Sequence, residues 1–487
     1  ALRAGGQVMA APRPSPFLRG NWRPVADETP PGGLAARTAE GELPRDLDGA
    51  FLRIGPNPVN PERFDGKPYH FFLGDGMVHQ VELRAGEATY RRRFVRTPSF
   101  CSGGARDELP SEALQGDEPS NERGGLANTA MVFHAGRLLC LEEGSKPWEI
   151  CLPSLETSGR FTFRGRLRHN FTAHPKVCPL TGELMFFGYG THHVPGSEAW
   201  VHYSVASKEG ELLRTVPVNF RKPVMTHDMA ITKCYSILLD FPLWDMDSPT
   251  KEDDKTRIGV MPRMAESEKD VVWIEAPGQY GYHVANAWEQ VPDDSKFSTV
   301  VVELVMVSAL GFDFRKSNTD SLRLRLFALD VSCGHLLDDR VLCDVPCEFP
   351  IVDARRVGLP TRYIWASRLA VGAKEVAAMD GILRYDMRKN VAKQITLPGG
   401  RHGGEVQFVP RRYSDRRGKE GDGYLLVLTV APAAVSELLV FDAETMSEQP
   451  VAVVSLPLSV PLGFHALWVD AEAYREHVAA EVWRSKL

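Results

Sequence analysis

The chain has 487 residues, of which 43% are hydrophobic and 25% are charged, a composition typical of a globular protein with a large core. Its 57 basic and 63 acidic residues give a net charge of −6, which argues against a nucleic-acid partner bound through its phosphates. Apolar runs such as residues 235–239 and 300–310 are shorter than the roughly 18 to 20 residues that cross a bilayer. We therefore expect no membrane span.

The N-terminal stretch has an unusual composition. Its first 26 residues contain four arginines, four prolines and no acidic residue, which is typical either of a transit-peptide remnant or of a disordered arm. We therefore expect an N-terminal arm over residues 1–39 and a single domain over residues 40–487. The eight cysteines lack the paired short spacings of a zinc ribbon or a disulfide scaffold, which favours a reducing compartment. The expected location is cytoplasmic, with a plastid as the alternative.

Short runs of β-forming residues, separated by scattered glycines and prolines, follow this arm through most of the chain. The clearest of them cover residues 88–95, 184–188, 235–239, 300–307, 322–331, 362–366, 423–429 and 437–441. Roughly four hundred residues of short strands are too many for one sandwich and lack the helices of a doubly wound fold, so an all-β propeller is the economical prediction. Residues 471–486 at the C-terminal end predict one amphipathic helix.

Four of the fourteen histidines stand out because each lies in a run of apolar or small residues: His174, His227, His283 and His465. Successive spacings of 53, 56 and 182 residues correspond to about one, one and three propeller blades, so each ring could point toward a common axis. Four neutral imidazoles would leave iron(II) two open octahedral positions for dioxygen and substrate. The spacing alone leaves a tetrahedral zinc site open.

Three glutamates are candidate partners for these histidines. A histidine that binds a metal usually donates its other ring N–H to a carboxylate or a carbonyl. Glu143, Glu348 and Glu405 lie in or beside apolar runs, where an unpaired carboxylate is costly. Each is either such an acceptor or an edge-strand residue that faces solvent.

Several long motifs resemble the carotenoid cleavage oxygenase family. They include DLDGAFLRIGPNP (46–58), HFFLGDGMVH (70–79), NTAMVFHAGRLLCLEEG (128–144), FTAHPK (171–176), MTHDMAIT (225–232), HVANAWE (283–289), EFPIVD (348–353), GGEVQFVP (403–410) and VPLGFHALWV (460–469). The resemblance runs from about residue 40 to the C-terminus and is strongest to the plant-type enzymes. It implies a seven-bladed β-propeller with one iron(II) per chain on its axis, under a dome of loops and short helices.

The resemblance also implies roles for individual residues. On the matching motifs, the four histidines are the iron ligands, and the three glutamates orient three of them. Thr129 would place its methyl group near an open iron position. The substrate tunnel would be lined by Phe100, Tyr282 and Phe349.

The implied activity is oxidative cleavage of a carbon–carbon double bond in a carotenoid or apocarotenoid, with dioxygen, to give two carbonyl products. The sequence has no GxGxxG loop after a strand and no Walker loop, so no nucleotide cofactor is indicated. The electrons for the reaction would therefore come from the polyene. Three alternatives remain: a metal-free interaction scaffold, a retinoid-type isomerohydrolase and a stilbene-cleaving dioxygenase. The stilbene-cleaving branch characteristically has a lysine immediately before the Glu143 position and a tyrosine near the Phe100 position. This chain has Glu142 and Phe100 there, which favours a lipophilic polyene over a phenolate.

One segment departs from the family pattern. Many members carry a longer apolar insertion between the FVRT and NTA motifs that is thought to dip into membranes, whereas residues 102–125 here have only Leu109 and Leu114 as strongly apolar side chains. We therefore expect at most weak peripheral membrane contact.

Overall fold

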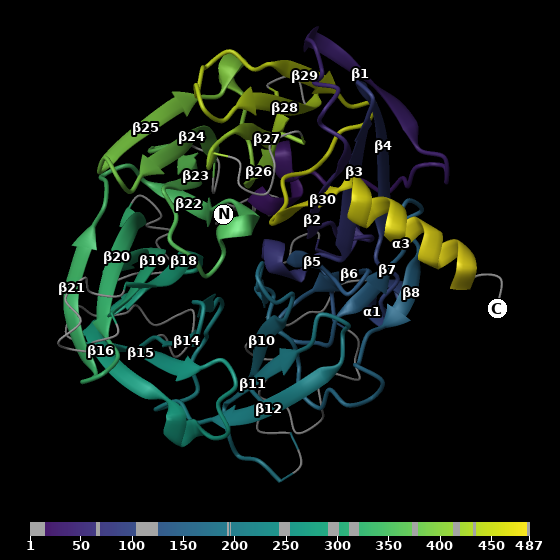
Figure 1. The fold of residues 1–487 in the computed structure, drawn as a ribbon. Coiled ribbons are helices and arrows are strands. Elements are labelled where there is room, and N and C mark those ends of the chain that lie inside the picture. Colours follow the sequence, from purple (N-terminus) through teal and green to yellow (C-terminus); the bar gives the residue numbers. More distant parts are fainter. Residues whose placement is uncertain are drawn as a thin grey trace, which may run out of the picture.

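The computed structural model describes residues 15–64, 69–103, 125–191, 194, 196–242, 254–290, 301–310, 321–372, 378–412, 419–431 and 435–484. These residues form an all-β, propeller-like ring of sheets (Figure 1). All eight cysteines lie among them, and each is a free thiol. Within the same residues, no helix has the length and apolar character needed to cross a membrane.

Five sheets of four or five antiparallel strands stand separately around the ring. The first two contain β5 (Ala130–His134), β6 (Arg137–Leu141), β7 (Trp148–Ile150) and β8 (Thr157–Arg160), then β9 (Lys176–Val177), β10 (Leu184–Tyr189), β11 (Val201–Ala206) and β12 (Leu212–Val218). The next two contain β13 (Ala230–Ile231), β14 (Tyr235–Asp240), β15 (Lys255–Pro262) and β16 (Val272–Pro277), then β17 (Gln279–Tyr280), β18 (Val284–Gln290), β19 (Val301–Leu310), β20 (Arg323–Asp330) and β21 (His335–Val341). The fifth contains β22 (Cys347–Ile351), β23 (Tyr363–Leu369), β24 (Met379–Asp386) and β25 (Val391–Thr396).

A sixth sheet has nine strands and joins the two ends of the chain. Its strands, in spatial order, are β26 (Val406–Pro410), β27 (Gly423–Val430), β28 (Ser436–Asp442), β29 (Ala452–Ser455), β1 (Leu34–Gly41), β4 (Glu87–Phe94), β3 (Gly76–Arg84), β2 (Gly49–Pro56) and β30 (Ala466–Asp470). The arrangement therefore differs from the expected seven separate blades, since five sheets stand alone in the described residues. The physical reason is β1, which pairs with β29 on one edge and with β4 on the other.

The expected strands and helix appear in the structure close to their expected positions. Strands with continuous apolar runs are buried throughout, as in β27 (GYLLVLTV), whereas rim strands such as β25 (VAKQIT) bury only some of their side chains. The predicted C-terminal helix is α3 (Ala471–Arg484). The expected boundary between residues 39 and 40 falls inside β1, so the last part of the expected arm belongs to the sheet.

The hydrophobic core lies between neighbouring sheets rather than at the centre of the ring. Trp365 of β23 stacks on Phe408 of β26 with ring centroids 4.7 Å apart, which joins the fifth sheet to the nine-stranded one. Phe171 and Phe186 stack in the same way, 4.2 Å apart, in the apolar cluster between the first and second sheets. Adjacent sheets are therefore held together by apolar contact.

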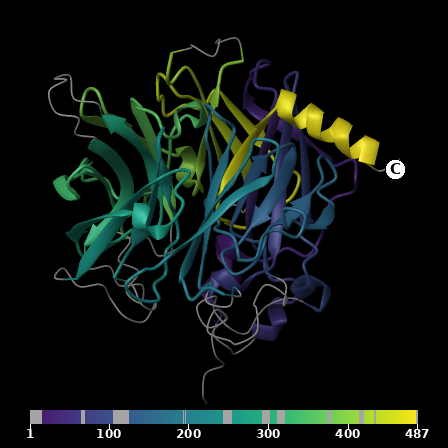
Figure 2. The same ribbon diagram turned by 60° about the horizontal axis from the view of Figure 1, so that its bottom comes forward.

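The two ends of the ring carry different elements (Figure 2). Strands such as β5, β18, β22 and β26 lie toward the centre, and strands such as β12, β21 and β25 lie at the rim (Figure 1). The four-residue helix α1 (Pro98–Cys101) and several short helical turns gather at one end, and α3 crosses the opposite end. The short turns cover Pro16–Leu18, Gly20–Trp22, Pro61–Phe64, Phe71–Leu73, Glu268–Asp270, Ala354–Arg356 and Pro398–Gly400.

Candidate metal centre

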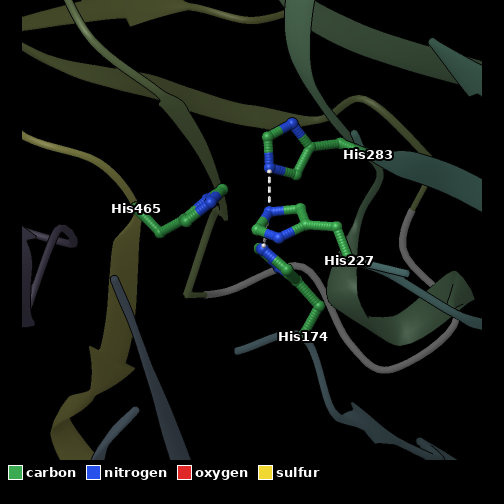
Figure 3. A group of neighbouring side chains, drawn as sticks. All are labelled: His174, His227, His283 and His465. Carbon is green, nitrogen blue, oxygen red and sulfur yellow. Dashed lines mark hydrogen bonds between the residues drawn. The ribbon is translucent and has the colours of Figure 1, made fainter. Parts of the chain in front are cut away.

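The four candidate histidines lie just before strands of four different sheets. His174 precedes β9 by two residues and His227 precedes β13 by three, while His283 and His465 come directly before β18 and β30. Because these strands all begin at the same end of the ring, the four rings meet on its axis (Figure 3). The similar spacings of 53 and 56 residues between His174, His227 and His283 thus reflect comparable positions in successive sheets.

The ligand atoms of the four rings all lie within 4.8 Å of one another. Nε2 of His227 is 2.8 Å from Nε2 of His174 and 3.2 Å from Nε2 of His283 (Figure 3). The ring of His465 completes the group, with its centroid 4.4 Å from that of His174. His174 is half-buried and the other three are buried. Nitrogen atoms this close need a proton or a cation between them, because their lone pairs otherwise repel.

All three candidate glutamates contact a histidine of this group. Nδ1 of His227 is hydrogen-bonded to Glu143, Nδ1 of His283 lies 2.6 Å from Glu348, and Nδ1 of His465 lies 3.1 Å from Glu405. An ionised carboxylate only accepts hydrogen bonds, so each Nδ1 carries the proton and each Nε2 presents a lone pair to the axis. The donor set therefore fits a single metal cation.

The backbone holds two of these glutamates in place. The N–H of Phe349 donates to Glu348 and the N–H of Ala466 donates to Glu405, each at 2.5 Å. Glu405 also accepts from the side-chain amide of Gln407, at 3.3 Å. The carboxylates are thus fixed before any ligand arrives, which fixes the rings that they orient.

Burial and neighbouring charges shift the pKa values in the group. Burial, together with the adjacent histidines, lowers the pKa of His174 and of His283 well below the usual range, which keeps both rings neutral. Burial also opposes charge on His227, but the Glu143 carboxylate outweighs it and raises the pKa of that histidine. The pKa of Glu348 is raised to about 7, chiefly by burial, against the opposing hydrogen bond from the Phe349 N–H.

Two residues that were not predicted from the sequence, Tyr189 and Asn170, hold Glu143 in place through hydrogen bonds. The hydroxyl of Tyr189 donates to Glu143, and the side-chain amide of Asn170 donates to the carbonyl oxygens of both residues, at 2.7 and 2.8 Å. Tyr189 is the last residue of the buried strand β10, where a phenol needs a polar partner. This need could have identified Tyr189 from the sequence. Asn170 gave no comparable signal, because its partners are distant in the sequence.

Thr129 lies directly before β5, at the same end of the ring. Its carbonyl oxygen accepts from the N–H of His465 at 3.3 Å, and its hydroxyl donates to the Asn128 side chain at 2.9 Å. Asn128 is in turn fixed by the carbonyl oxygens of Phe72 and Gly74. The hydroxyl of Thr129 is therefore engaged next to a candidate ligand.

Two of the three predicted tunnel residues contact the histidines. The ring of Tyr282 lies 5.6 Å from that of His227, and the ring of Phe349 lies 5.1 Å from His283 and 4.9 Å from His465. Phe349 has a φ of 51°, in the left-handed region that bulky side chains rarely adopt. The register of β22 shifts there, and such an irregularity re-aims a side chain. The strain places an apolar ring beside the candidate metal site.

The third tunnel residue has a different environment. Phe100 lies on α1, where its ring packs against Phe94 at 4.9 Å and lies under the guanidinium of Arg96 at 4.6 Å. Its role in substrate binding stays a prediction.

The environment of Glu142 corrects the substrate argument made from the sequence. The residue is buried, and its carboxylate accepts from the N–H groups of Leu126 and Gly144 and from the hydroxyl of Ser145, at 2.9 to 3.1 Å. It therefore holds a turn together, and it neither faces solvent nor serves as a free charge that repels substrate. Glu142 follows the end of β6 at Leu141, and its partner Leu126 is distant in the sequence, so the sequence did not reveal this role.

A family model described as retinal pigment epithelial membrane protein matches residues 22–470. The chain belongs to the carotenoid cleavage oxygenase family. Among its relatives, the carotenoid 9,10(9′,10′)-cleavage dioxygenase 1 of Pisum sativum is 34% identical over 95% of this chain and 91% of its own length. A carotenoid cleavage oxygenase of Mycobacterium tuberculosis is 30% identical over 95% of this chain and 99% of its own. The protein is therefore an enzyme of this family, an oxidoreductase that incorporates molecular oxygen.

Solved structures of the carotenoid cleavage oxygenase family share the fold. The lignostilbene dioxygenase of Pseudomonas brassicacearum has a TM-score of 0.80 and 25% identity, covering 95% of this chain and all of its own. The cobalt-substituted apocarotenoid oxygenase of Synechocystis has a TM-score of 0.74 and 24% identity, covering 94% and 99%. Members that act on different substrates thus have one architecture, so the fold alone leaves the substrate open.

Proposed function

We propose that this enzyme is an iron(II) dioxygenase that cleaves a carbon–carbon double bond of a carotenoid or apocarotenoid into two carbonyl products. The observation that carries the proposal is the meeting of four imidazoles on the ring axis, three of them hydrogen-bonded through Nδ1 to a glutamate. In this proposal His174, His227, His283 and His465 are the ligands of one iron ion per chain. Glu143, Glu348 and Glu405 orient the rings.

The spacing of the nitrogen atoms is compatible with an octahedral metal ion. With bonds of about 2.1 Å, neighbouring ligands stand about 3.0 Å apart on an octahedron and about 3.4 Å apart on a tetrahedron. The two Nε2 distances at His227, 2.8 and 3.2 Å, lie around the octahedral value. Four neutral nitrogen ligands on an octahedron leave two positions open, as the reaction requires.

The proposed reaction adds both atoms of dioxygen across one double bond, so that an alkene and O₂ become two carbonyl compounds without a further reductant. Iron(II), when bound, supplies the place at which dioxygen and the electron-rich double bond meet. The protein has no proton to transfer in this balance, and its task is to position the substrate. The rings of Tyr282 and Phe349 would exclude water and hold the polyene beside the histidines. Thr129, whose hydroxyl is engaged by Asn128, would present its methyl group to an open position.

We also propose that the nine-stranded sheet comprises two blades, β26–β29 and β30 with β2–β4, joined by β1. Seven chain segments, each at the start of an inner strand, would then each bring one residue to the axis. The support is where these residues lie: Thr129, His283, Glu405 and His465 directly before β5, β18, β26 and β30, His174 and His227 two and three residues before β9 and β13, and Glu348 within β22. Residues 40–487 would form this single domain, to which β1 adds residues 34–39. The first 14 residues of the expected arm lie outside the described residues.

The substrate class rests on the relatives and on the aromatic rings of the site. Plant relatives named for cleavage at the 9,10 and 9′,10′ double bonds are 33% to 35% identical to this chain, so these bonds are the first to test. The alternative is a stilbene, the substrate class that the name of the Pseudomonas structure indicates. Phe100 in place of a phenol-binding tyrosine favours the hydrocarbon, because phenylalanine offers no hydrogen bond.

The test is incubation of the iron-loaded enzyme with carotenoids, apocarotenoids and 4-hydroxystilbenes under ¹⁸O₂, followed by mass analysis. We expect apocarotenoid carbonyl products and a higher kcat/KM for the long polyene than for the stilbene. Cleavage of the stilbene with no turnover of any polyene would overturn the substrate class and leave the metal centre intact. Absence of oxygen uptake with every compound would overturn the dioxygenase proposal itself.

For location, we propose the cytoplasm, with a plastid as the alternative. A 32% identical relative from Arabidopsis thaliana is named as chloroplastic, which keeps the alternative in view. We also propose only weak peripheral membrane contact, because residues 104–124, which lie outside the described residues, are polar and charged. Flotation with liposomes tests the contact, and salt-independent co-flotation of most of the protein would contradict it.

A further inference from the structure

Asp228, the residue after His227, lies at the junction of three segments that carry candidate ligands. Only 2% of its surface is exposed. One carboxylate oxygen, Oδ1, is 2.7 Å from Nζ of Lys176 and accepts from the N–H of Met229, while Oδ2 accepts from the N–H of Val284 at 2.7 Å. These partners belong to the segments of His174, His227 and His283.

Each contact acts close to a ligand. Val284 follows His283 directly, so its hydrogen bond to Asp228 fixes the peptide group that leads away from that histidine. Lys176 follows His174 by two residues, with Pro175 between them, and the proline ring restricts the backbone that joins the ammonium group to the histidine. Movement of any one segment would therefore stretch a buried, charge-assisted hydrogen bond to Asp228.

His174 differs from the other three histidines in how its ring is held. The other three histidines are each oriented by a glutamate on Nδ1, whereas His174 has no carboxylate hydrogen-bonded to its ring among the residues described here. Its segment instead reaches a carboxylate through Lys176. We propose that Asp228 is a positioning residue that sets the relative placement of three of the four metal ligands, and that the Lys176–Asp228 ion pair does for His174 what the glutamates do for the others.

This inference rests on the proposed metal centre and competes with a simpler account based on charge alone. If Asp228 acted only through its charge, its removal would leave the Lys176 cation near the site and weaken metal binding. Removal of Lys176 would then do the opposite, because an unpaired carboxylate attracts a cation. If the ion pair positions the His174 segment, both removals weaken metal binding. The sign of the Lys176 effect therefore separates the two accounts.

The experiment measures Co²⁺ binding by the full-length apo-enzyme, from the visible absorption bands of the bound ion and by competition with a chelator. The variants are Asp228→Asn and Lys176→Met. The matched control is Asp240→Asn, which removes a buried carboxylate of β14 that pairs with Arg221 and Arg257 away from the histidines. His227→Ala reports on the metal centre itself.

We expect Asp228→Asn to weaken Co²⁺ affinity by about 10- to 100-fold and to alter the shape of the absorption bands, since these report ligand geometry. Lys176→Met should weaken affinity by less, and Asp240→Asn should lower the melting temperature without changing the bands. Wild-type affinity in Asp228→Asn, or tighter binding in Lys176→Met, would overturn the positioning role. If Asp228→Asn fails to fold, the direction of the Lys176→Met effect alone decides. Unchanged Co²⁺ binding in His227→Ala would instead overturn the metal centre.

Discussion

The two ends of the ring both hold buried histidines, and they use them differently. At the end covered by α3, Nδ1 of His477 donates to the carbonyl oxygen of Gly136 at 2.8 Å, and its Nε2 accepts from the N–H of Leu152 at 3.0 Å. Each nitrogen has a backbone partner of its own. At the opposite end, the Nε2 atoms of His174, His227 and His283 face one another. A histidine with both nitrogens satisfied joins elements, whereas histidines with facing lone pairs call for a cation.

The sharpest way to break this comparison is to remove a ring from the axial group. His227→Ala should abolish metal binding and turnover. The ring of His227 lies between two others, and its removal leaves only three of the four proposed nitrogen ligands. Circular dichroism should be unchanged. Metal content per chain and oxygen uptake are the measurements, and a variant that keeps one iron per chain and cleaves substrate would contradict the assignment.

A smaller effect is expected when a proposed ligand stays and only the carboxylate hydrogen-bonded to it changes. Glu348→Gln should reduce iron affinity or activity by roughly 10- to 100-fold, because the amide can still accept from His283 but carries no charge. The iron dissociation rate, measured with a chelator in excess, checks this. A rate equal to that of the wild type would mean that Glu348 acts in packing alone.

At the end of the ring covered by α3, removal of a histidine should lower stability and leave the metal in place. His477→Ala removes two hydrogen bonds and leaves the Leu152 N–H buried without a partner, so the free energy of unfolding should fall by about 2 kcal/mol. Urea unfolding measures the loss, and iron content serves as the control. A loss of iron in the folded variant would show that the two ends are coupled and would remove the distinction between them.

The smallest expected effect concerns His70, in the connection between β2 and β3. Its Nδ1 accepts from the N–H of Phe72, and burial lowers its pKa to about 4. The unfolded chain binds a proton near pH 6.5 and the folded chain does not, so the free energy of unfolding falls as the pH drops from 6.5 toward 4 and is unaffected above this range.

The variant His70→Asn keeps a side chain that can cap the short turn and removes the titration. Between pH 7 and pH 5.5, the wild type should lose about 1 kcal/mol more of its free energy of unfolding than the variant does. Urea midpoints at the two pH values measure this difference. Equal losses would place the proton uptake elsewhere.

The sequence predicted those features that depend on local pattern. The four axial histidines were separable from His477 and His70 because their apolar contexts recur at blade spacing, and the strands were visible as apolar runs between turn residues. Features that depend on contact between distant segments were missed. Asp228 reads as an ordinary polar residue until Lys176 and Val284 are beside it, and β1 gives no sign that it will pair on both edges.

The pairing of β2 with β30 has a consequence for the order in which the protein is made. The two strands lie more than 400 residues apart, so β2 has no contact with β30 until all the residues between them have been synthesised. His465, directly before β30, is the last of the four histidines to leave the ribosome. At about 5 to 20 residues per second, the interval between β2 and β30 lasts roughly 20 to 80 seconds. The four-histidine group is therefore complete only after residue 465 has been synthesised, long after β2 has been made.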